Sequence, residues 1–403
     1  MLRGSRRKED CFLSSGKKKI LIVAGEASGD LHGSGLATAI IRLCPDVSVY
    51  GVGNGLMRQV GVEIIIDSSR LAVVGITEVF SRIGSLLKAY RQLKKFIRTN
   101  HLALLVLIDF PDFNLLLARE AKRAGVPVLY YISPQVWAWR SGRVHKIASR
   151  VNKMAVILPF EISIYRNVGL DAEFVGHPLL DVLYVSKEET SPVNERKWRG
   201  APLIALLPGS RAKEVKSLLP SMARAAGIIM KKKPGARFIL PIAPTLSLPE
   251  VKKIWQYPSI PVEFVEDKTY QAIKTADLAI VASGTATLET AILNTPMVIV
   301  YQVSPVSYLI ARALVKMNWI GLVNIVAGRR VVPELLQKEA NGERIAAEAL
   351  KILDDESYRK EMIQALAEVR EKLGTPGAAE RVAKMALEMI GENFRHRSVN
   401  NAQ

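Results

Sequence analysis

The sequence predicts two α/β domains, each built on a parallel β-sheet, that face each other across a cleft. Three observations predict this fold class. The chain has 403 residues, which is too long for one typical core and suits two domains of ordinary size. Short apolar runs alternate with longer amphipathic segments, which is the pattern of βαβ units. A polar stretch, residues 191–200, separates two series of such runs.

The first series predicts five buried strands, because each is a short apolar run bounded by polar residues. These strands are expected at residues 19–24, 48–52, 104–108, 126–131 and 153–157. The polar stretch 191–200 contains Pro192 and closes with Gly200, and it predicts a crossover to the second domain.

The second series predicts four more strands, at residues 203–207, 237–241, 278–281 and 297–301. From Gly342 onward Glu, Lys and Ala dominate, and the pattern is helical. We therefore expect a basic flexible tail at residues 1–18, a first domain at 19–190 and a second domain, terminal helices included, at 191–403. Ligands of such sheets bind at the carboxyl ends of the strands, so the loops there are the candidate sites.

The composition favours an anionic partner, since 56 Lys and Arg face 38 Asp and Glu, for a net charge of +18. No run reaches the roughly 18 uninterrupted apolar residues of a spanning helix, so we expect a chain that at most lies on a membrane. The histidines are scattered and no Cys/His cluster occurs, so a bound metal is not expected. The loop at residues 25–30 is neither a Walker loop nor a GxGxxG fingerprint, so no ATP or NAD cofactor is expected. Basic residues are not interleaved with stacking aromatics, which argues against nucleic acid as a partner.

The first strand runs into a loop, residues 24–30, whose small residues can approach a ligand closely. Gly25 and Gly29 let the backbone pass near a phosphate, and the helix start after them offers unpaired N–H groups. Ser28 and Asp30 complete this candidate binding loop. The alternative, a tight strand-to-helix turn capped by Ser28 or Asp30, is equally compatible with the pattern.

The second domain opens with a similar strand, glycine turn and helix at residues 206–211. Ser210 can cap the helix, and Arg211 supplies a forked cation where a diphosphate would sit. An arginine in the first turn of a helix is unfavourable for the helix dipole, which favours a ligand role over a solvated surface role.

A third loop, residues 282–289, follows the strand at 278–281. Ser283, Gly284 and Thr285 form a nest of backbone and side-chain donors. Glu289 lies one turn into the following helix, where its two oxygens suit a ribose diol, although a first-turn acid also stabilises a helix by itself. Two such anion-binding loops in one domain, at residues 206–211 and 282–289, favour a nucleotide as the ligand.

The strand at 104–108 ends in Asp109, which makes this carboxylate the candidate for base chemistry. A carboxylate where a buried strand meets a cleft has a tunable pKa. Pro111 ends the strand, and we expect Asp112 or Asn114 to cap the following helix instead. A single strand-end Asp is equally often structural.

The segment 79–98 is a basic amphipathic helix. Its apolar residues recur at helical spacing on one face, and Lys and Arg occupy the rest, with Glu78 as the nearby acid. This pattern is typical of a helix that lies in a bilayer interface, and equally of a helix that covers a protein core.

Eight blocks of this sequence together resemble the signature blocks of the lipid-A-disaccharide synthases, in the same order. They lie at residues 24–30, 108–114, 133–140, 158–161, 176–178, 207–211, 282–286 and 324–329, within a stretch from about 19 to 375. One block alone is modestly specific, whereas the full series is very specific.

The resemblance implies a GT-B fold, with two facing Rossmann-like domains and a cleft between them. It implies an inverting, metal-independent transfer of 2,3-diacylglucosamine from its UDP derivative to 2,3-diacylglucosamine 1-phosphate. The products would be UDP and the β-1,6-linked lipid A disaccharide 1-phosphate of lipopolysaccharide synthesis. It also implies a peripheral location on the inner face of the bacterial cytoplasmic membrane. Oligomeric state, including a homodimer, stays open.

The resemblance also assigns roles to residues. Asp109 is implied as the catalytic residue, and Arg211, the loop 283–286 and Asn324 are implied to hold UDP. Two alternatives remain at this point. One is another GT-B enzyme, such as a UDP-N-acetylglucosamine transferase or epimerase, and the other is a nucleotide-binding peripheral membrane protein without catalysis.

Overall fold

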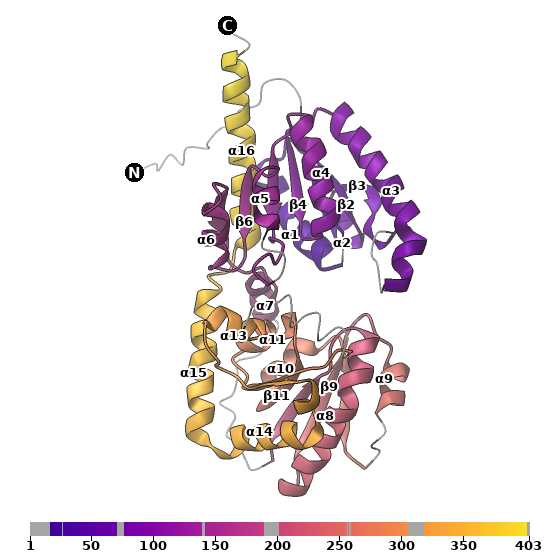
Figure 1. Cartoon of the computed structure of the whole chain (residues 1–403), viewed down its shortest axis with the longest axis vertical. Helices are drawn as coiled ribbons and strands as arrows, with labels where there is room; N and C mark the ends of the chain where they lie inside the picture. Colours follow the sequence, from indigo (N-terminus) through magenta and orange to yellow (C-terminus); the bar gives the residue numbers. More distant parts are fainter. Residues whose placement is uncertain are drawn as a thin grey trace, which may run out of the picture. The chain divides into compact units, whose positions relative to one another are not determined.

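The computed structural model describes residues 17–25, 27–70, 76–138, 142–188, 201–255, 257, 259–304 and 318–400. At residues 27, 70, 76–83, 184–188 and 392–400 it describes the backbone path alone. Most of the predicted basic tail and the whole predicted crossover at 191–200 lie outside this part of the chain. Two compact units are formed (Figure 1). Unit 1 runs to Asp181 and resumes at Pro376, and unit 2 spans Val182–Thr375.

Unit 1 is built on a seven-stranded parallel sheet with the strand order β3-β2-β1-β4-β5-β6-β7. All five strands predicted in this part of the chain are confirmed. The order reverses direction at β1, so the loops after β1 and β4 flank a topological switch point. The strands are β1 (Lys18–Ala24), β2 (Val47–Gly53), β3 (Glu63–Asp67), β4 (Leu104–Ile108), β5 (Val128–Tyr131), β6 (Lys153–Val156) and β7 (Asp171–Phe174).

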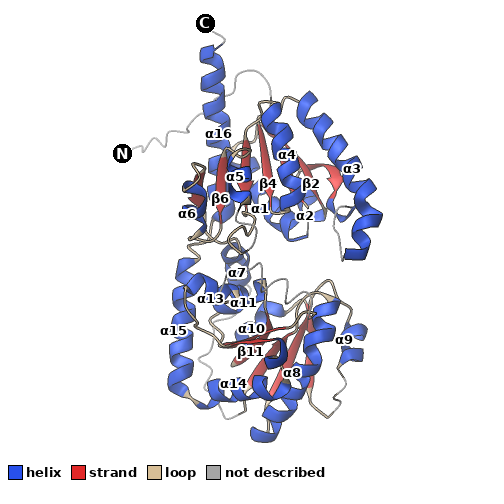
Figure 2. Ribbon diagram, viewed as in Figure 1, coloured by secondary structure: helices blue, strands red, loops and turns tan. Residues whose placement is uncertain are grey.

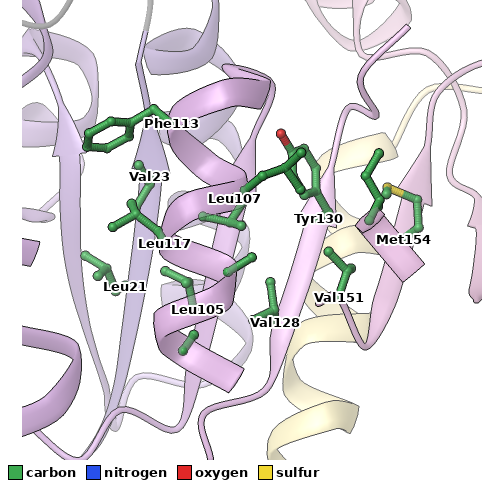
Figure 3. Close-up of a cluster of buried hydrophobic side chains, with 14 of the residues drawn as sticks. Leu21, Val23, Leu105, Leu107, Phe113, Leu117, Val128, Tyr130, Val151 and Met154 are labelled. Carbon is green, nitrogen blue, oxygen red and sulfur yellow. The ribbon is translucent and has the colours of Figure 1, made fainter. Parts of the chain in front are cut away.

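Helices cover both faces of this sheet, as Figure 2 shows. Alternate residues of the central strands enter opposite clusters. Leu21 and Val23 pack with α3 to α6, whereas Ile20 and Ile22 pack with α1 and α16. Figure 3 shows part of the first cluster. The helices are α1 (Ala27–Leu43), α2 (Gly55–Gln59), α3 (Ile76–Thr99), α4 (Pro111–Arg123), α5 (Arg143–Ala148), α6 (Glu161–Arg166) and α16 (Ala378–Asn400). A further helix, α7 (Leu179–Glu188), begins in unit 1 and continues into unit 2.

The last helix, α16, belongs to unit 1, which differs from the predicted domain boundaries of 19–190 and 191–403. Its apolar side, including Val382, Ala386 and Ile390, is buried in the same cluster as α1 and the strands of the first sheet. At its start, the Asp181 carboxylate accepts the backbone N–H groups of Gly377 and Ala379. Helical periodicity predicts the apolar side of α16 but not the sheet that covers it.

Unit 2 is built on a six-stranded parallel sheet with the order β10-β9-β8-β11-β12-β13. The four predicted strands of the second series are confirmed. The switch point of this sheet lies between β8 and β11. The strands are β8 (Leu203–Leu207), β9 (Arg237–Ile242), β10 (Val262–Glu266), β11 (Leu278–Ala282), β12 (Met297–Tyr301) and β13 (Glu334–Leu336).

The helices of unit 2 include the predicted helical segment after Gly342. Asn341 and Asp355 cap α14 and α15, and each side chain accepts a backbone N–H three residues later at 2.9 Å. None of the described helices combines the length and the apolar character needed to cross a bilayer. The helices are α8 (Ala212–Lys232), α9 (Leu248–Ile254), α10 (Thr269–Thr275), α11 (Thr285–Ile292), α13 (Leu322–Ala327), α14 (Gly342–Asp354) and α15 (Glu356–Lys372).

Two histidines of unit 1 influence each other: His32 in α1, which is partly buried, and His177, which is buried. His177 is 6% exposed, and its Nδ1 accepts the N–H of Leu179 at 3.2 Å. Burial, and after it the charge of His32, lowers the pKa of His177 to about 3. Burial likewise lowers the pKa of His32 to about 4, although Asp181 opposes this shift. Both imidazoles are therefore neutral in the folded protein near neutral pH.

The first prediction is that unit 1 loses stability as the pH falls from about 6.5 toward 4. An unfolded histidine has a pKa of about 6.5, so the unfolded chain binds more protons than the folded chain in this window. The free energy of unfolding therefore decreases as the pH decreases. Each histidine contributes up to about 1.4 kcal/mol per pH unit. His177→Asn keeps an acceptor for Leu179 but removes the titration. Urea denaturation at several pH values should give a shallower pH dependence for the variant, and parallel curves would contradict the prediction.

Candidate functional site

A cavity of about 780 Å³ lies in unit 2 at the switch point of its sheet. Its walls include the loops after four strands, at residues 208–211, 243–244, 267–271 and 283–286. Parallel strands bring their carboxyl ends to one edge, and the reversal of strand order separates the loops after β8 and β11 enough to leave a crevice. The volume falls within the range of small-molecule and cofactor sites.

Two helices begin at this cavity and supply anion-binding groups. Arg211 is the N-cap of α8, and Gly284 is the N-cap of α11. The first N–H groups of a helix have no partner within it, so two such starts at one cavity favour a ligand with negative charge. The Arg211 guanidinium is largely exposed, and its Nη1 lies 3.3 Å from Oε1 of Glu214. Both residues line the cavity, so the contact places the guanidinium on its wall.

The cavity wall also contains a partly buried carboxylate. Glu289 accepts a hydrogen bond from the Tyr270 hydroxyl at 3.3 Å. Burial raises the pKa of Glu289, and the hydrogen bond from Tyr270 opposes this rise. Burial also raises the pKa of Tyr270, so its hydroxyl keeps the proton that it donates. A carboxylate held in this way can accept hydrogen bonds from a diol.

The structure brings six of the sequence-predicted residues together at the cavity. They are Ser210, Arg211, Ser283, Gly284, Thr285 and Glu289. The other predicted residue of unit 2, Asn324, does not line the cavity.

Asn324 is fully buried, and both ends of its amide group are paired within the protein. Its Oδ1 accepts the N–H groups of Val331 and Val332, and its Nδ2 donates to the Val332 carbonyl and to Oε1 of Glu334 at 2.7 Å. The direct contact with a ligand that the resemblance implied therefore conflicts with this geometry, because no polar atom of the amide remains for a ligand.

Asn324 is nevertheless linked to the cavity through Glu334 and a short series of hydrogen bonds. Glu334 accepts the N–H groups of Ile320 and Gly321 at 2.9 and 3.0 Å. The Ile320 carbonyl in turn accepts the Ser283 hydroxyl at 3.3 Å. Asn324 thus helps to hold the backbone that holds Ser283.

In unit 1, Asp109 lies directly after β4, beside the switch point of the first sheet. It is partly buried, and both Asp109 and Phe110 have positive φ, at 45° and 48°. The helix α4 begins at Pro111, and neither predicted cap is used: its N-cap is Phe110, without a side-chain hydrogen bond. Asp112 is exposed and pairs with Arg143 at 2.6 Å.

The four predicted residues of the first loop have mainly structural surroundings. A Cβ at Gly25 would clash with the Phe110 ring, and one at Gly29 would lie 3.1 Å from the Ala24 side chain. Asp30 is 3% exposed. Its carboxylate accepts the backbone N–H groups of residues 54, 56 and 57, so it caps α2 and not its own helix. Ser28 is exposed. Asp30 therefore has a structural role at the start of α2, and its predicted role as a ligand stays a prediction.

Sequence reasoning missed Glu161, a buried carboxylate after β6. It accepts hydrogen bonds from the Ser133 hydroxyl at 2.6 Å, Nε1 of Trp137 at 3.0 Å and the Leu158 N–H at 3.1 Å. Burial raises the pKa of Glu161, and these donors oppose the rise. The carboxylate ties the loop after β5 to the loop after β6. The sequence signal that could have identified Glu161 was its position at the end of the block 158–161, which follows a buried strand.

Tyr270 and the nearby lining residues of α10 were missed for a different reason. They follow β10, a strand that the sequence pattern did not predict, so the loop after it was not recognised as a site. Residues 267–271 carry a tyrosine and charged side chains, but these are ordinary in a surface loop.

The part of α3 whose side chains are described, residues 84–99, covers the core with one face and presents a basic face to solvent. Leu93 and Ile97 are buried, whereas Lys88, Arg91 and Lys95 are exposed. The adjacent helix α4 contributes Glu120, whose carboxylate is buried against Lys94, Arg98 and Arg123. Burial raises the pKa of Glu120, but Lys94 and the other partners outweigh this effect, so the pKa lies below its usual value. The side chains of residues 79–83 lie outside the described part.

Comparison with known proteins gives a family. A family model described as "Lipid-A-disaccharide synthetase" matches residues 20–389. A lipid-A-disaccharide synthase of Syntrophus aciditrophicus is 50% identical over 375 residues, which cover 93% of this chain and 98% of that protein. One from Geobacter metallireducens is 47% identical over 376 residues, with the same two shares.

A solved structure with a similar fold is Acinetobacter baumannii MurG, with a TM-score of 0.56, 12% identity, and coverage of 92% of this chain and 99% of that one. At this identity the likeness shows the fold alone, and the predicted GT-B architecture is confirmed.

The second prediction concerns Asn324. Asn324→Ala leaves the N–H groups of Val331 and Val332 buried without a partner, and each such group costs about 1–3 kcal/mol. We expect a loss of about 3 kcal/mol in the free energy of unfolding, measured by urea denaturation. The control is Asn341→Ala, which removes an exposed helix cap and should cost about 1 kcal/mol. Equal small losses in both variants would argue against a structural role for Asn324.

Proposed function

This chain belongs to the lipid-A-disaccharide synthetase family, and on that premise we propose its substrates, its catalytic residues and its location. As a family member it is a glycosyltransferase of lipid A biosynthesis. We propose that the donor is UDP-2,3-diacylglucosamine and the acceptor is 2,3-diacylglucosamine 1-phosphate. The products would be the β-1,6-linked disaccharide 1-phosphate and UDP.

The cavity of unit 2 carries the donor assignment. It combines two helix N-termini, an arginine and a hydrogen-bonded carboxylate at one switch point. A uridine diphosphate matches these groups: its phosphates suit the helix starts and Arg211, and its ribose diol suits Glu289. Asn324 supports this site through Glu334 and the backbone that holds Ser283.

Asp109 acts as the general base in the proposed mechanism. Its carboxylate takes the proton of the acceptor's 6-hydroxyl as that oxygen forms a bond to the anomeric carbon of the donor. The bond between the anomeric carbon and the diphosphate oxygen breaks, and its electron pair leaves with UDP. Attack opposite the leaving group inverts the anomeric centre. Arg211 and the start of α11 stabilise the negative charge that develops on the diphosphate.

The protein works on the inner face of the cytoplasmic membrane in this proposal, since both substrates carry acyl chains. The basic face of α3 supports this location, because exposed Lys and Arg attract anionic lipid. Leu87 on α3 and Leu116 on α4 add exposed apolar side chains, at 47% and 46%. The two helices pack side by side in unit 1 (Figure 1).

The third prediction separates catalysis from donor binding. Asp109→Asn removes the proton acceptor, so formation of disaccharide and UDP from the two acyl sugars, followed by mass spectrometry, should fall by at least about a hundredfold. Calorimetry should show unchanged UDP affinity, because Asp109 lies in the other unit from the cavity. Arg211→Ala is the reverse control and should weaken UDP binding as well as turnover. Near-normal turnover of Asp109→Asn would remove Asp109 from the mechanism.

The fourth prediction tests the basic face. The triple charge reversal Lys88→Glu, Arg91→Glu and Lys95→Glu should lower binding to vesicles containing phosphatidylglycerol by at least about a hundredfold, because each basic residue near an anionic surface contributes about 1 kcal/mol. A matched control reverses three exposed lysines of α8, Lys216, Lys231 and Lys232, and changes the net charge equally. Flotation of both variants checks the prediction, and equal losses would show that net charge and not this face decides binding.

A further inference from the structure

Backbone strain is concentrated beside the proposed catalytic carboxylate. Asp109 and Phe110 follow β4, and Ile132 follows the neighbouring strand β5, and all three have positive φ. This left-handed conformation is uncommon for residues other than glycine, and for a β-branched residue it is a genuine outlier. Such strain persists only where the surrounding structure fixes it, and it often marks functional sites.

Hydrogen bonds fix both peptide groups that flank the Cα atom of Asp109. The N–H of Asp109 donates to the Tyr131 carbonyl at 3.2 Å. The carbonyl of Asp109 accepts the Tyr130 hydroxyl at 2.6 Å and Nδ2 of Asn114 at 2.7 Å. Two fixed peptide planes determine φ and ψ at the Cα atom between them. The direction of the Cα–Cβ bond, which carries the carboxylate, is thereby determined as well.

The two side-chain donors are themselves held rigidly. Tyr130 and Asn114 are both fully buried, one in β5 and the other in α4. Figure 3 shows the Tyr130 ring among the apolar side chains of the core, with its hydroxyl at the end of the ring. Burial, and then the charge of Asp109, raises the pKa of Tyr130, so the hydroxyl remains a donor.

Asn114 provides a second, independent sign that its donors matter. Its Nδ2 also donates to the Ile108 carbonyl at 3.1 Å. Its Oδ1, by contrast, is buried with no hydrogen-bond partner in the described structure. A buried carbonyl oxygen without a partner is unfavourable, and an apolar residue would avoid it. We infer that the amide nitrogen of Asn114 offsets this cost by donating to the two carbonyls at the end of β4, those of Ile108 and Asp109.

We propose that Tyr130 and Asn114 are positioning residues that hold the strained backbone of Asp109 and so fix its carboxylate for proton transfer. The inference rests on the proposed role of Asp109 as the base. It requires no contact of either residue with substrate. Displacement of a catalytic group by about 1 Å is enough to reduce a rate about a hundredfold, so loss of one of these hydrogen bonds should be visible in turnover.

Tyr130→Phe tests this proposal, because it removes one hydroxyl and leaves the packing of the ring. With the full chain, UDP-2,3-diacylglucosamine and its 1-phosphate acceptor, we expect kcat to fall by about 10- to 100-fold. The KM for the donor should stay within about twofold, because the donor cavity is unchanged. Asn114→Ala removes the other donor and should give the same division between kcat and KM.

The matched control is Tyr131→Phe. Tyr131 is the next residue of β5 and is equally buried, but its side chain belongs to the cluster on the opposite face of the sheet. Its kcat should stay within about twofold of the unmodified protein. Thermal unfolding of each variant is measured to check that the assay temperature lies below the unfolding transition of that variant.

The double variant Asp109→Asn with Tyr130→Phe distinguishes positioning from a general loss of structure. If Tyr130 acts through Asp109, the double variant should have the turnover of Asp109→Asn alone. The positioning role would be overturned, with Asp109 still the base, by either of two results. One is a loss of kcat in the double variant equal to the product of the two single losses, and the other is an unchanged kcat in Tyr130→Phe. Full turnover of Asp109→Asn itself is a different result, which would overturn the proposed mechanism and with it this inference.

Discussion

The organisation of each unit depends on one constraint: a parallel sheet opens a crevice only where its strand order reverses. In unit 2 this reversal lies between β8 and β11, and the two loops that flank it carry the helix starts and Arg211. In unit 1 it lies between β1 and β4, where the Phe110 ring packs against Gly25 and Asp109 ends its strand. The same topology thus places the loops of the 780 Å³ cavity in unit 2 and the Asp109 turn in unit 1.

The predicted strands and the missed ones differ in where they lie. The nine predicted strands are all interior, and the four missed ones, β3, β7, β10 and β13, are the edges of the two sheets. An interior strand of a parallel sheet is covered on both faces and reads as a continuous apolar run, whereas an edge strand is partly exposed. The strand β10, whose residues are partly buried or exposed and include two glutamates, lacks that run. The helix after β10, α10, begins with Thr269 and Tyr270, so the missed edge also concealed part of the cavity wall.

Among the candidate site residues, sequence motifs identified loops that line the cavity of unit 2 but could not distinguish a residue on the cavity wall from a buried support. Arg211 and Glu289 lie on the cavity wall. Asn324 and Asp30 belong to equally distinctive motifs, yet both are buried and their polar atoms are paired inside the protein. The difference lies in hydrogen-bond partners that are distant in sequence, such as Asn54 for Asp30 and Glu334 for Asn324. A local pattern holds no information about those partners.

The return of α16 to unit 1 makes unit 2 an insertion within the first unit. A chain made from its amino terminus delivers all of unit 2 before α16 emerges. The six-stranded sheet of unit 2 has all of its own segments by residue 375, so it can fold while the face of the first sheet that α16 covers is still open. That face, with apolar residues such as Ile20 and Ile22, is the part of the nascent protein that stays exposed longest. During biosynthesis, unit 1 begins first but is completed only after all of unit 2 has been made.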